Sequence, residues 1–315
     1  MTSLTRHEFI GDGDGPHLLI TGGVHGDEFE PMAAIRRLAG MFAEGEPRVA
    51  GLRGRVTLVP IVNESAFLRG HRCAEDGLDL ARTCPGRTDG SLTERTAHAL
   101  SELIRRADFY IDLHTGGTEL SVLPLAGYVL HADKAILDAQ RRMARAFNLP
   151  VVWGTAANLD GRSLSVARDA GVPAIYCEYL GSATCNRAGV EAYVDGCLNV
   201  LGELRMVEGN AAPSRVQHFV EDPRPSSGHM QVCHPSPVDG YFEPAHELGD
   251  CIAKDTPLGT VYSQRDHSPH AISSEHDGIV LVLRTFPRVR AGESVGVVLD
   301  LAMAAMGVGV DAPHM

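Results

Sequence analysis

The pattern of apolar and polar positions in the first two thirds of the chain alternates between short apolar runs and longer amphipathic stretches. The short runs, typical of buried strands, are residues 17–24, 54–62, 108–113, 122–130 and 172–179. The amphipathic stretches, with apolar residues close to helical spacing, are residues 29–43, 91–106, 135–147, 163–170 and 188–207. Alternation of strands and helices with mostly short joins predicts an α/β domain built around a largely parallel sheet.

The pattern changes after residue 207. Residues 208–229 carry prolines and small polar residues, and we expect a linker there. From residue 230 to residue 315, short apolar segments are interrupted by glycines. A weak internal repeat relates the segment that starts at Gly240 to the one that starts at Gly278. This predicts a small all-β domain, a barrel or sandwich of two similar halves. The expected organisation is therefore a domain at 1–207, a linker at 208–229 and a β domain at 230–315.

Composition narrows the class of protein. At 315 residues the chain is longer than one ordinary core needs, which also favours two domains. A net charge of −12 argues against a nucleic-acid surface, and no run approaches the roughly 20 apolar residues of a membrane helix. The seven cysteines form no Cys-x-x-Cys pair, as expected for reduced thiols, and the first residues lack an apolar signal core. We therefore expect a cytoplasmic enzyme or binding protein without nucleic-acid or membrane partners; whether it forms a homo-oligomer stays open.

The first strand ends in residues that can bind a metal. His25 and Glu28 lie three residues apart between the apolar run and the following helix, where ligands of open α/β sheets collect. Imidazole and carboxylate together suit zinc, which in catalytic sites takes three protein ligands and leaves one position for water. Taken alone, His-x-x-Glu is a weak signal, and a surface loop without a metal is the simpler interpretation.

A second strand end makes the metal interpretation the better one. Residues 108–113 run directly into His114, which supplies a third candidate ligand. Asp112 lies two residues earlier and shares the face of His114 on a strand, so it can support the ligand from behind.

Two further features carry candidate chemistry. The 29 residues from Asn63 to Ser91 show no obvious periodicity, which favours a functional loop. Its arginines can clamp a carboxylate or polarise a carbonyl, although some can also simply solvate the loop. The apolar run 172–179 holds Glu178 near its end, and a buried carboxylate is costly unless it is paired or takes part in chemistry.

Together these pieces resemble a known family. The motifs are Gly-Gly-x-His25-Gly-x-Glu28, Asn63 with Gly70-x-Arg72, Asp79-Leu-x-Arg82, Asp112-Leu-His114 and the strand-end Glu178. In this order they are similar to the succinylglutamate desuccinylase/aspartoacylase family of the zinc carboxypeptidase superfamily, over roughly residues 17–205. The resemblance implies a zinc-carboxypeptidase-like fold, with a mixed, largely parallel sheet between helices followed by a smaller β domain.

The resemblance also implies roles for individual residues. Glu178 would be the general base, and Arg72 would polarise the scissile carbonyl and stabilise the oxyanion. Arg82 and Asn63 would bind the substrate. One zinc ion per chain would be held by His25, Glu28 and His114. The implied reaction is hydrolysis of a linear amide, in which a small N-acyl amino acid or related metabolite is deacylated.

One position departs from the family pattern. The usual Asp-Leu-Asn-Arg is Asp79-Leu80-Ala81-Arg82 here, and alanine cannot donate a hydrogen bond to a carboxylate. Either Arg82 acts alone, or another residue supplies the second contact, or the substrate differs. We therefore expect poor turnover of N-acetylaspartate and N-succinylglutamate, and an N-acetylated diamino acid, as in ectoine breakdown, is a candidate suggested by the breadth of the family.

Two other functions stay open at this point. A non-catalytic sensing protein could keep the fold and bind an acylated metabolite, with Ala81 as its only hint. A carboxypeptidase acting on short peptides is the alternative within the enzymes. The β domain is expected to cover the site and to restrict it to small substrates, which removal of residues 230–315 would test.

Overall fold

The computed structural model describes residues 4–209, 213–225 and 227–306. Its main element is an 11-stranded mixed sheet with the order β1-β3-β2-β4-β7-β5-β13-β10, in which β6 pairs with β5, β8 with β6 and β15 with β13. The strands are β1 (His7–Ile10), β2 (Gly13–Thr21), β3 (Arg53–Val59), β4 (Phe109–His114), β5 (Leu120–Val129), β6 (Val151–Thr155), β7 (Ala174–Gly181), β8 (His218–Glu221), β10 (Cys251–Ile252), β13 (Gly278–Arg284) and β15 (Gly296–Asp300). Strands β3, β2, β4 and β7 run parallel, as do β5, β6 and β8, while β5 is antiparallel to β7 and β13.

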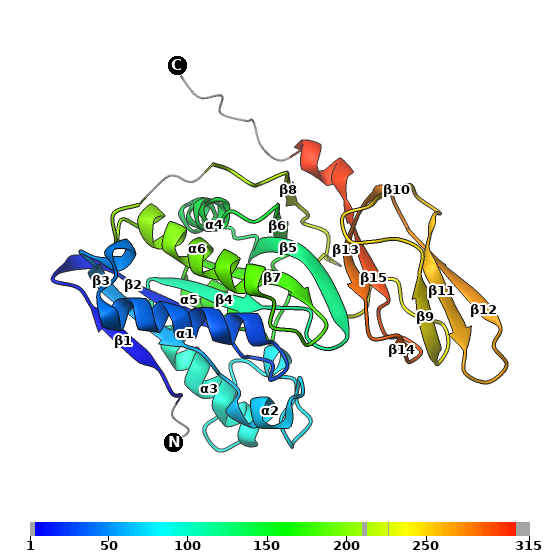
Figure 1. Cartoon of the computed structure of the whole chain (residues 1–315), viewed down its shortest axis with the longest axis horizontal. Coiled ribbons are helices and arrows are strands. Elements are labelled where there is room, and N and C mark those ends of the chain that lie inside the picture. The colour runs from blue at the N-terminus through cyan, green and yellow to red at the C-terminus, as the bar shows by residue number, and fades with distance from the viewer. Residues whose placement is uncertain (1–3, 210–212, 226, 307–315) are drawn as a thin grey trace.

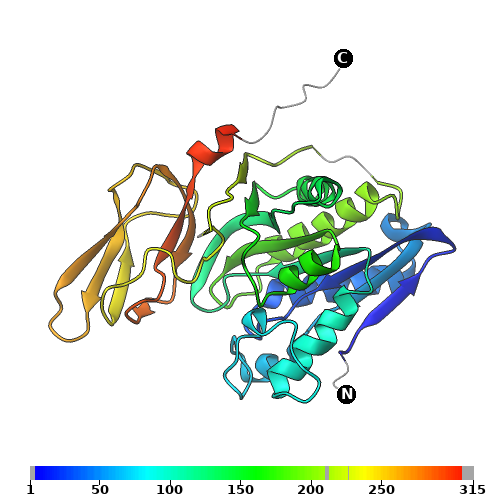
Figure 2. The same cartoon turned by 180° about the vertical axis from the view of Figure 1, so that it is seen from behind.

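Helices cover both faces of this sheet. One face carries α1 (Phe29–Glu44), α4 (Lys134–Phe147) and α6 (Arg187–Glu203), and the other carries α3 (Leu92–Ile104) and α5 (Ser163–Ala170), as Figures 1 and 2 show. The short elements are α2 (Glu64–Arg69), η1 (Pro47–Val49), η2 (Leu80–Arg82) and η3 (Leu301–Met306). A separate apolar cluster fills the space under each helical layer. The predicted α/β architecture with a largely parallel sheet is confirmed.

The helix bounds follow from local chemistry. The Ser91 side chain accepts a hydrogen bond from Glu94 N, and the Glu94 carboxylate accepts one from Ser91 N, so a capping box starts α3 where the sequence predicted it. Helix α1 ends at Gly45, whose φ of 67° is the left-handed conformation that stops a helix.

The C-terminal region contributes to two sheets. Strands β9 (Gly240–Pro244), β11 (Pro257–Ser263), β12 (Pro269–Ser273) and β14 (Arg288–Val289) form a separate four-stranded antiparallel sheet. The two segments of the weak internal repeat form β9 and β13. Each pairs with a short strand that follows the other segment in the chain, β9 with β14 and β13 with β10. Because β13 also pairs with β5, the main sheet continues into the C-terminal region.

The range 208–229, expected to be a linker, contains strand β8. This strand extends the sheet beside β6, and the Arg141 guanidinium of α4 holds its Glu221 carboxylate through two contacts of 2.8 and 2.7 Å. A four-residue strand flanked by prolines gives too short a pattern to be recognised from sequence. The division into domains at 1–207 and 230–315 stays a prediction.

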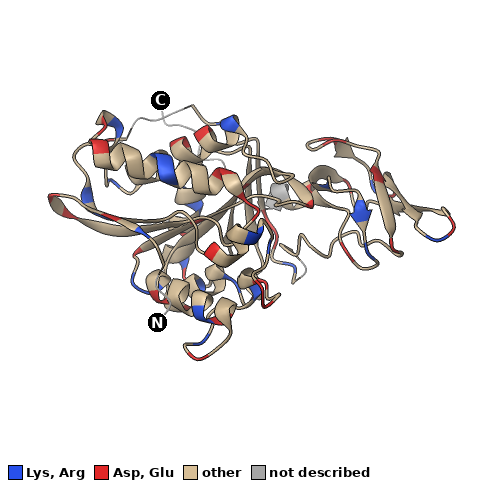
Figure 3. Cartoon of the chain, turned by 60° about the horizontal axis from the view of Figure 1, so that its bottom comes forward, with Lys and Arg blue, Asp and Glu red and all other residues tan. Residues whose placement is uncertain are grey.

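Basic and acidic residues are interspersed over the described part of the chain, as Figure 3 shows. No helix among the described residues is both long and apolar enough to cross a membrane.

Candidate active site

The parallel strands β2, β4 and β7 bring the candidate residues to one edge of the sheet. Thr21 at the end of β2 is the register partner of Asp112 on β4, and His114 on β4 is the partner of Glu178 on β7. The chain after β2 approaches α2 closely, because a side chain at position 26 would come within 2.0 Å of the Ala66 backbone. Glycine at that position therefore lets the turn that carries the first two candidate ligands pack against α2.

The Glu28 carboxylate lies between two imidazoles. Its Oε1 is 2.7 Å from His25 Nδ1, and its Oε2 is 3.1 Å from His114 Nδ1. Burial opposes the charge of Glu28, but the two histidines hold the pKa of its carboxyl well below the usual range. The three side chains predicted as ligands therefore form one cluster.

Each histidine also has a carboxylate behind it. His25 Nε2 lies 3.1 Å from Asp79 Oδ1, and His114 Nε2 lies 3.1 Å from Asp112 Oδ2. Asp112 also accepts hydrogen bonds from Thr21 Oγ1 at 2.7 Å and from Ser163 Oγ. Such partners fix the orientation of a ligating histidine, and here both Nδ1 atoms face Glu28.

This donor set fits zinc. One ligand atom from each of the three residues, two imidazole nitrogens and a carboxylate oxygen, lies within 4.8 Å of the others. The His₂Glu set is the known one of thermolysin and carboxypeptidase A. These residues could hold the ion that the sequence predicted.

Glu178 is buried beside this cluster and lacks a compensating partner. Its Oε2 has no hydrogen-bond partner among the described residues. Burial, and to a lesser degree the negative charge of Glu28, raise the pKa of Glu178 to about 8 even though His114 works in the opposite direction. A carboxyl in such surroundings exchanges a proton near neutral pH, which suits a group that transfers protons during a reaction.

Arg72 points at the site from the loop that follows α2. Its Nε and Nη2 donate to Asp79 Oδ2 at 3.0 and 2.9 Å. Burial disfavours its charge, but Asp79 and Glu28 raise the pKa of Arg72 above its ordinary value. Arg72 is therefore a fixed positive charge next to the candidate ligands.

Two cavities meet at these residues. The larger one, named the outer cavity here, has a volume of about 400 Å³ and reaches the loop 115–120 and the C-terminal residues Phe286 and Arg288. The smaller one, named the inner cavity, has a volume of about 70 Å³ and reaches Arg82 and Arg162. The residues lining both are His25, Arg72, Glu178, Met230 and Gln231. A small molecule can therefore extend to both sides of the cluster of His25, Glu28 and His114.

The inner cavity holds two arginines. Cys84 N donates to Gly161 O at 2.9 Å, and this contact joins the loop of Arg82 to the loop of Arg162. Loss of hydration and the charge of Arg162 lower the pKa of Arg82 to about 10, so it stays protonated at neutral pH. The Arg162 guanidinium donates only to a carbonyl oxygen, Gly228 O, among the described residues. Two cations without a carboxylate partner of their own are suited to bind an anionic group.

The loop that carries Arg72 and Arg82 is tied to helix α3. Asp76 accepts hydrogen bonds from Ser91 Oγ at 2.7 Å and from Thr93 N and Oγ1 at 2.9 and 2.7 Å. These bonds lower the pKa of Asp76 to about 2, although partial desolvation acts in the opposite direction. No local pattern marks this anchor, because a stretch without periodicity separates Asp76 from its partners.

Asn63 is the predicted site residue that stands apart. Its Oδ1 accepts a hydrogen bond from Ala66 N at 3.2 Å and caps α2, and it lines neither cavity. Its predicted contact with the substrate stays a prediction.

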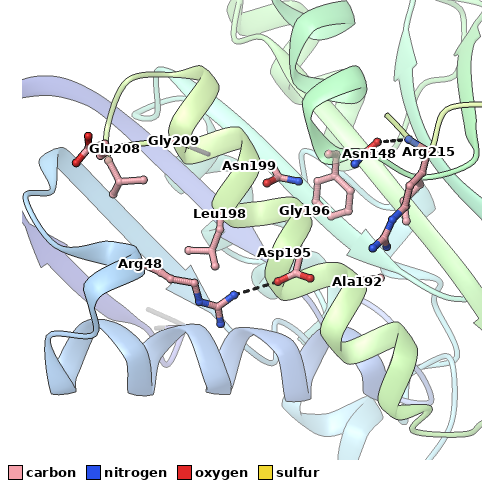
Figure 4. A pocket seen from close by; sticks show the side chains of 13 residues that line it. Arg48, Asn148, Ala192, Asp195, Gly196, Leu198, Asn199, Glu208, Gly209 and Arg215 are labelled. Atoms are coloured by element: carbon pink, nitrogen blue, oxygen red, sulfur yellow. Dashed lines mark hydrogen bonds and ion pairs between the residues drawn. The ribbon is translucent and has the colours of Figure 1, made fainter. Parts of the chain in front are cut away.

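A further cavity, of about 250 Å³, lies between α6, the C-terminal end of α4 and Arg48 of η1 (Figure 4). It contains the ion pair between Arg48 and Asp195 and the hydrogen bond from Arg215 N to Asn148 Oδ1. None of the candidate catalytic or metal-binding residues lines it.

Comparisons with known proteins agree with the geometry. Residues 14–201 match the succinylglutamate desuccinylase/aspartoacylase catalytic domain. The N-alpha-acetyl-L-2,4-diaminobutyric acid deacetylase of Halomonas elongata is 31% identical over 300 residues, which cover 92% of this chain and 83% of that protein.

Solved structures show the same fold. A succinylglutamate desuccinylase/aspartoacylase from Rhodobacter sphaeroides superposes with a TM-score of 0.81 at 29% identity, covering 94% of this chain and 89% of that one. The product-bound ectoine utilization protein EutE (DoeB) from Ruegeria pomeroyi gives a TM-score of 0.83 at 28% identity, covering 93% and 87%. The chain belongs to the succinylglutamate desuccinylase/aspartoacylase family.

Proposed function

We propose that this protein is a zinc-dependent deacylase that hydrolyses the amide bond of a small N-acyl amino acid. The observation that carries the proposal is the buried Glu178 carboxylate beside the cluster of His25, Glu28 and His114, at the point where the two cavities meet. An N-acetylated diamino acid is the first candidate substrate, since the Halomonas elongata relative is named for the deacetylation of one.

Each residue has a defined part in this reaction. Zinc, when bound, would act as a Lewis acid and lower the pKa of a water molecule to about 7. Glu178 accepts the proton of the attacking water and passes it to the leaving nitrogen. Arg72 donates to the carbonyl oxygen as negative charge develops on it. Arg82 and Arg162 bind the carboxylate of the amino acid in the inner cavity, and the acyl group extends into the outer one.

The two alternative functions have less support. A protein that only senses a metabolite has no need of an uncompensated buried carboxylate beside a complete set of metal ligands. A carboxypeptidase would have to accommodate the rest of the peptide in the outer cavity, whose volume is about 400 Å³ and which Phe286 and Arg288 border.

Metal content tests the ligand set. Wild-type protein should hold about one zinc per chain by mass spectrometry, and Glu28→Ala and His114→Ala should each lose it, because two ligands do not retain a catalytic zinc. If wild-type protein holds no metal after zinc is added back, the hydrolase mechanism is wrong.

A substrate panel tests the reaction. Zinc-loaded protein should hydrolyse Nα-acetyl-L-2,4-diaminobutyrate, with release of acetate measured directly. N-acetyl-L-aspartate and N-succinyl-L-glutamate should be poor substrates. A kcat/KM of about 10⁴ M⁻¹s⁻¹ or more for either would contradict the substrate assignment.

A further inference from the structure

Ala81 stands where the family pattern has an asparagine, so the inner cavity lacks the hydrogen-bond donor of that amide. Its side chain lines the inner cavity, directly before Arg82 in the chain. Arg82 Nη1 donates to the Ala81 carbonyl oxygen at 2.7 Å, so the other end of its guanidinium needs a different partner.

That partner comes from the C-terminal region, far away in sequence. Arg82 Nη2 donates to Gln231 Oε1 at 2.7 Å, across 149 residues of sequence. A guanidinium has only donors, so the atom of Gln231 that faces it is the amide oxygen. The Nε2 of Gln231, with two hydrogens to donate, has no hydrogen-bond partner among the described residues. Gln231 lines both cavities, so its side chain borders the space that the substrate would occupy.

The position of Gln231 is fixed by the C-terminal strands. Met230 is buried in the apolar cluster that includes Ile279 and Leu281 of β13. Ser294 N donates to Gln231 O at 3.2 Å. Contacts with the C-terminal region therefore position Gln231, and these contacts are independent of the loop that carries Arg82.

We infer that Gln231 takes the place of the missing asparagine, with its Oε1 orienting Arg82 and its Nε2 donating to the α-carboxylate of the amino acid. This assignment rests on the proposed function, and it makes the C-terminal region a direct contributor to substrate recognition. A hydrogen bond to a charged group is worth enough that its loss weakens binding about tenfold.

The test replaces Gln231 by a side chain of similar length that cannot form hydrogen bonds. Gln231→Met should raise KM for Nα-acetyl-L-2,4-diaminobutyrate at least about tenfold with kcat within about threefold of wild type. The KM for the α-carboxamide of the same compound should stay unchanged, because the lost donor acts on the carboxylate. Val232→Ala is the matched control, since Val232 is 58% exposed on the same segment. Thermal unfolding of each variant shows that it is folded.

A second variant tests the replacement itself. Ala81→Asn added to Gln231→Met should restore at least part of the lost affinity, because it returns a donor to the inner cavity. An unchanged KM in Gln231→Met, an equal loss for acid and carboxamide, or no recovery with Ala81→Asn would each overturn the assignment.

Direct binding separates this assignment from the proposed function. Calorimetry on the zinc-loaded protein compares L-2,4-diaminobutyrate with its α-carboxamide. A preference for the carboxylate that Gln231→Met weakens supports the assignment, even if no N-acyl amino acid is hydrolysed. Absence of hydrolysis would count against the proposed function alone. Equal binding of the two compounds by the wild type, or binding of neither, overturns the assignment of Gln231.

Discussion

At the scale of single residues, the site holds carboxylates in opposite electrostatic settings. Glu28 faces two imidazoles, which keep the pKa of its carboxyl low, so it is a permanent anion available to a cation. Glu178 is mainly desolvated, and its pKa is raised to about 8. Under the proposed function, the two neighbouring carboxylates therefore have different parts, Glu28 in metal binding and Glu178 in proton transfer.

Glu178→Gln should separate proton transfer from metal binding. The amide has nearly the same shape but cannot accept a proton, so we expect kcat to fall at least about 100-fold while zinc content and the unfolding temperature stay at wild-type values. Turnover of Nα-acetyl-L-2,4-diaminobutyrate and metal analysis on the same preparation give both readouts. Activity close to wild type would rule Glu178 out as the base.

The sequence could predict that His25, Glu28 and His114 lie together, but not that Gln231 contacts Arg82, for a physical reason. His25, Glu28 and His114 lie at the ends of apolar runs, and parallel strands bring their carboxyl ends to one edge. Gln231 reaches Arg82 only through the packing of Met230 against β13, and no local pattern marks that contact.

At the scale of elements, the site depends on a loop anchored by one carboxylate. Asp76 bonds the N-terminal turn of α3, where the unpaired backbone N–H groups favour an anion. The start of α3 was predictable from its capping residues, whereas α2 and η2 within the loop were not, since each spans only 6 or 3 residues.

Asp76→Asn should destabilise the folded protein by about 1 kcal/mol at pH 7, since it weakens hydrogen bonds to an ionised acceptor. The pKa of Asp76 is lowered from 3.8 to about 2, so its stabilising contribution is present above pH 4 and is lost as the pH falls towards 2. Urea unfolding of both proteins across this range measures the difference.

Asp89→Asn is the matched control for that experiment. Asp89 lies in the same loop and is exposed, so its substitution should leave the free energy of unfolding unchanged at every pH. A difference between Asp76→Asn and wild type that does not shrink at low pH would contradict the electrostatic explanation.

At the scale of the whole molecule, the C-terminal region forms one wall of the outer cavity. Phe286 and Arg288 line it, with the guanidinium of Arg288 5.8 Å from the centre of the Phe286 ring. Glu119, on the loop before β5, contacts Arg288 Nη2 at 3.2 Å and Arg284 Nη2 at 3.5 Å. Ion pairs thus hold this wall against the main sheet.

Phe286→Ala should broaden the range of acyl groups. Removal of the ring enlarges the outer cavity, so we expect kcat/KM for an N-butanoyl substrate to rise about tenfold relative to the N-acetyl substrate. Tyr241→Ala, which removes an exposed aromatic of β9 that lines neither cavity, should leave the ratio unchanged. An unchanged ratio in Phe286→Ala would show that the wall does not limit acyl size. This substitution is a cleaner test than removal of residues 230–315, which would also strip β13 from the main sheet.

The pairing of β13 with β5 has a consequence for the order of synthesis. Leu120, Ser121 and Val122 pair with residues that follow about 160 positions later, so at a ribosomal rate of about 5–20 residues per second this edge stays open for roughly 10–30 s. An open edge of apolar strand is a template for pairing with another chain. A nascent chain that is released before residue 282 therefore contains the site loop and all the candidate metal ligands. The edge of its strand β5 stays exposed, however, whereas in the finished protein β13 covers that edge.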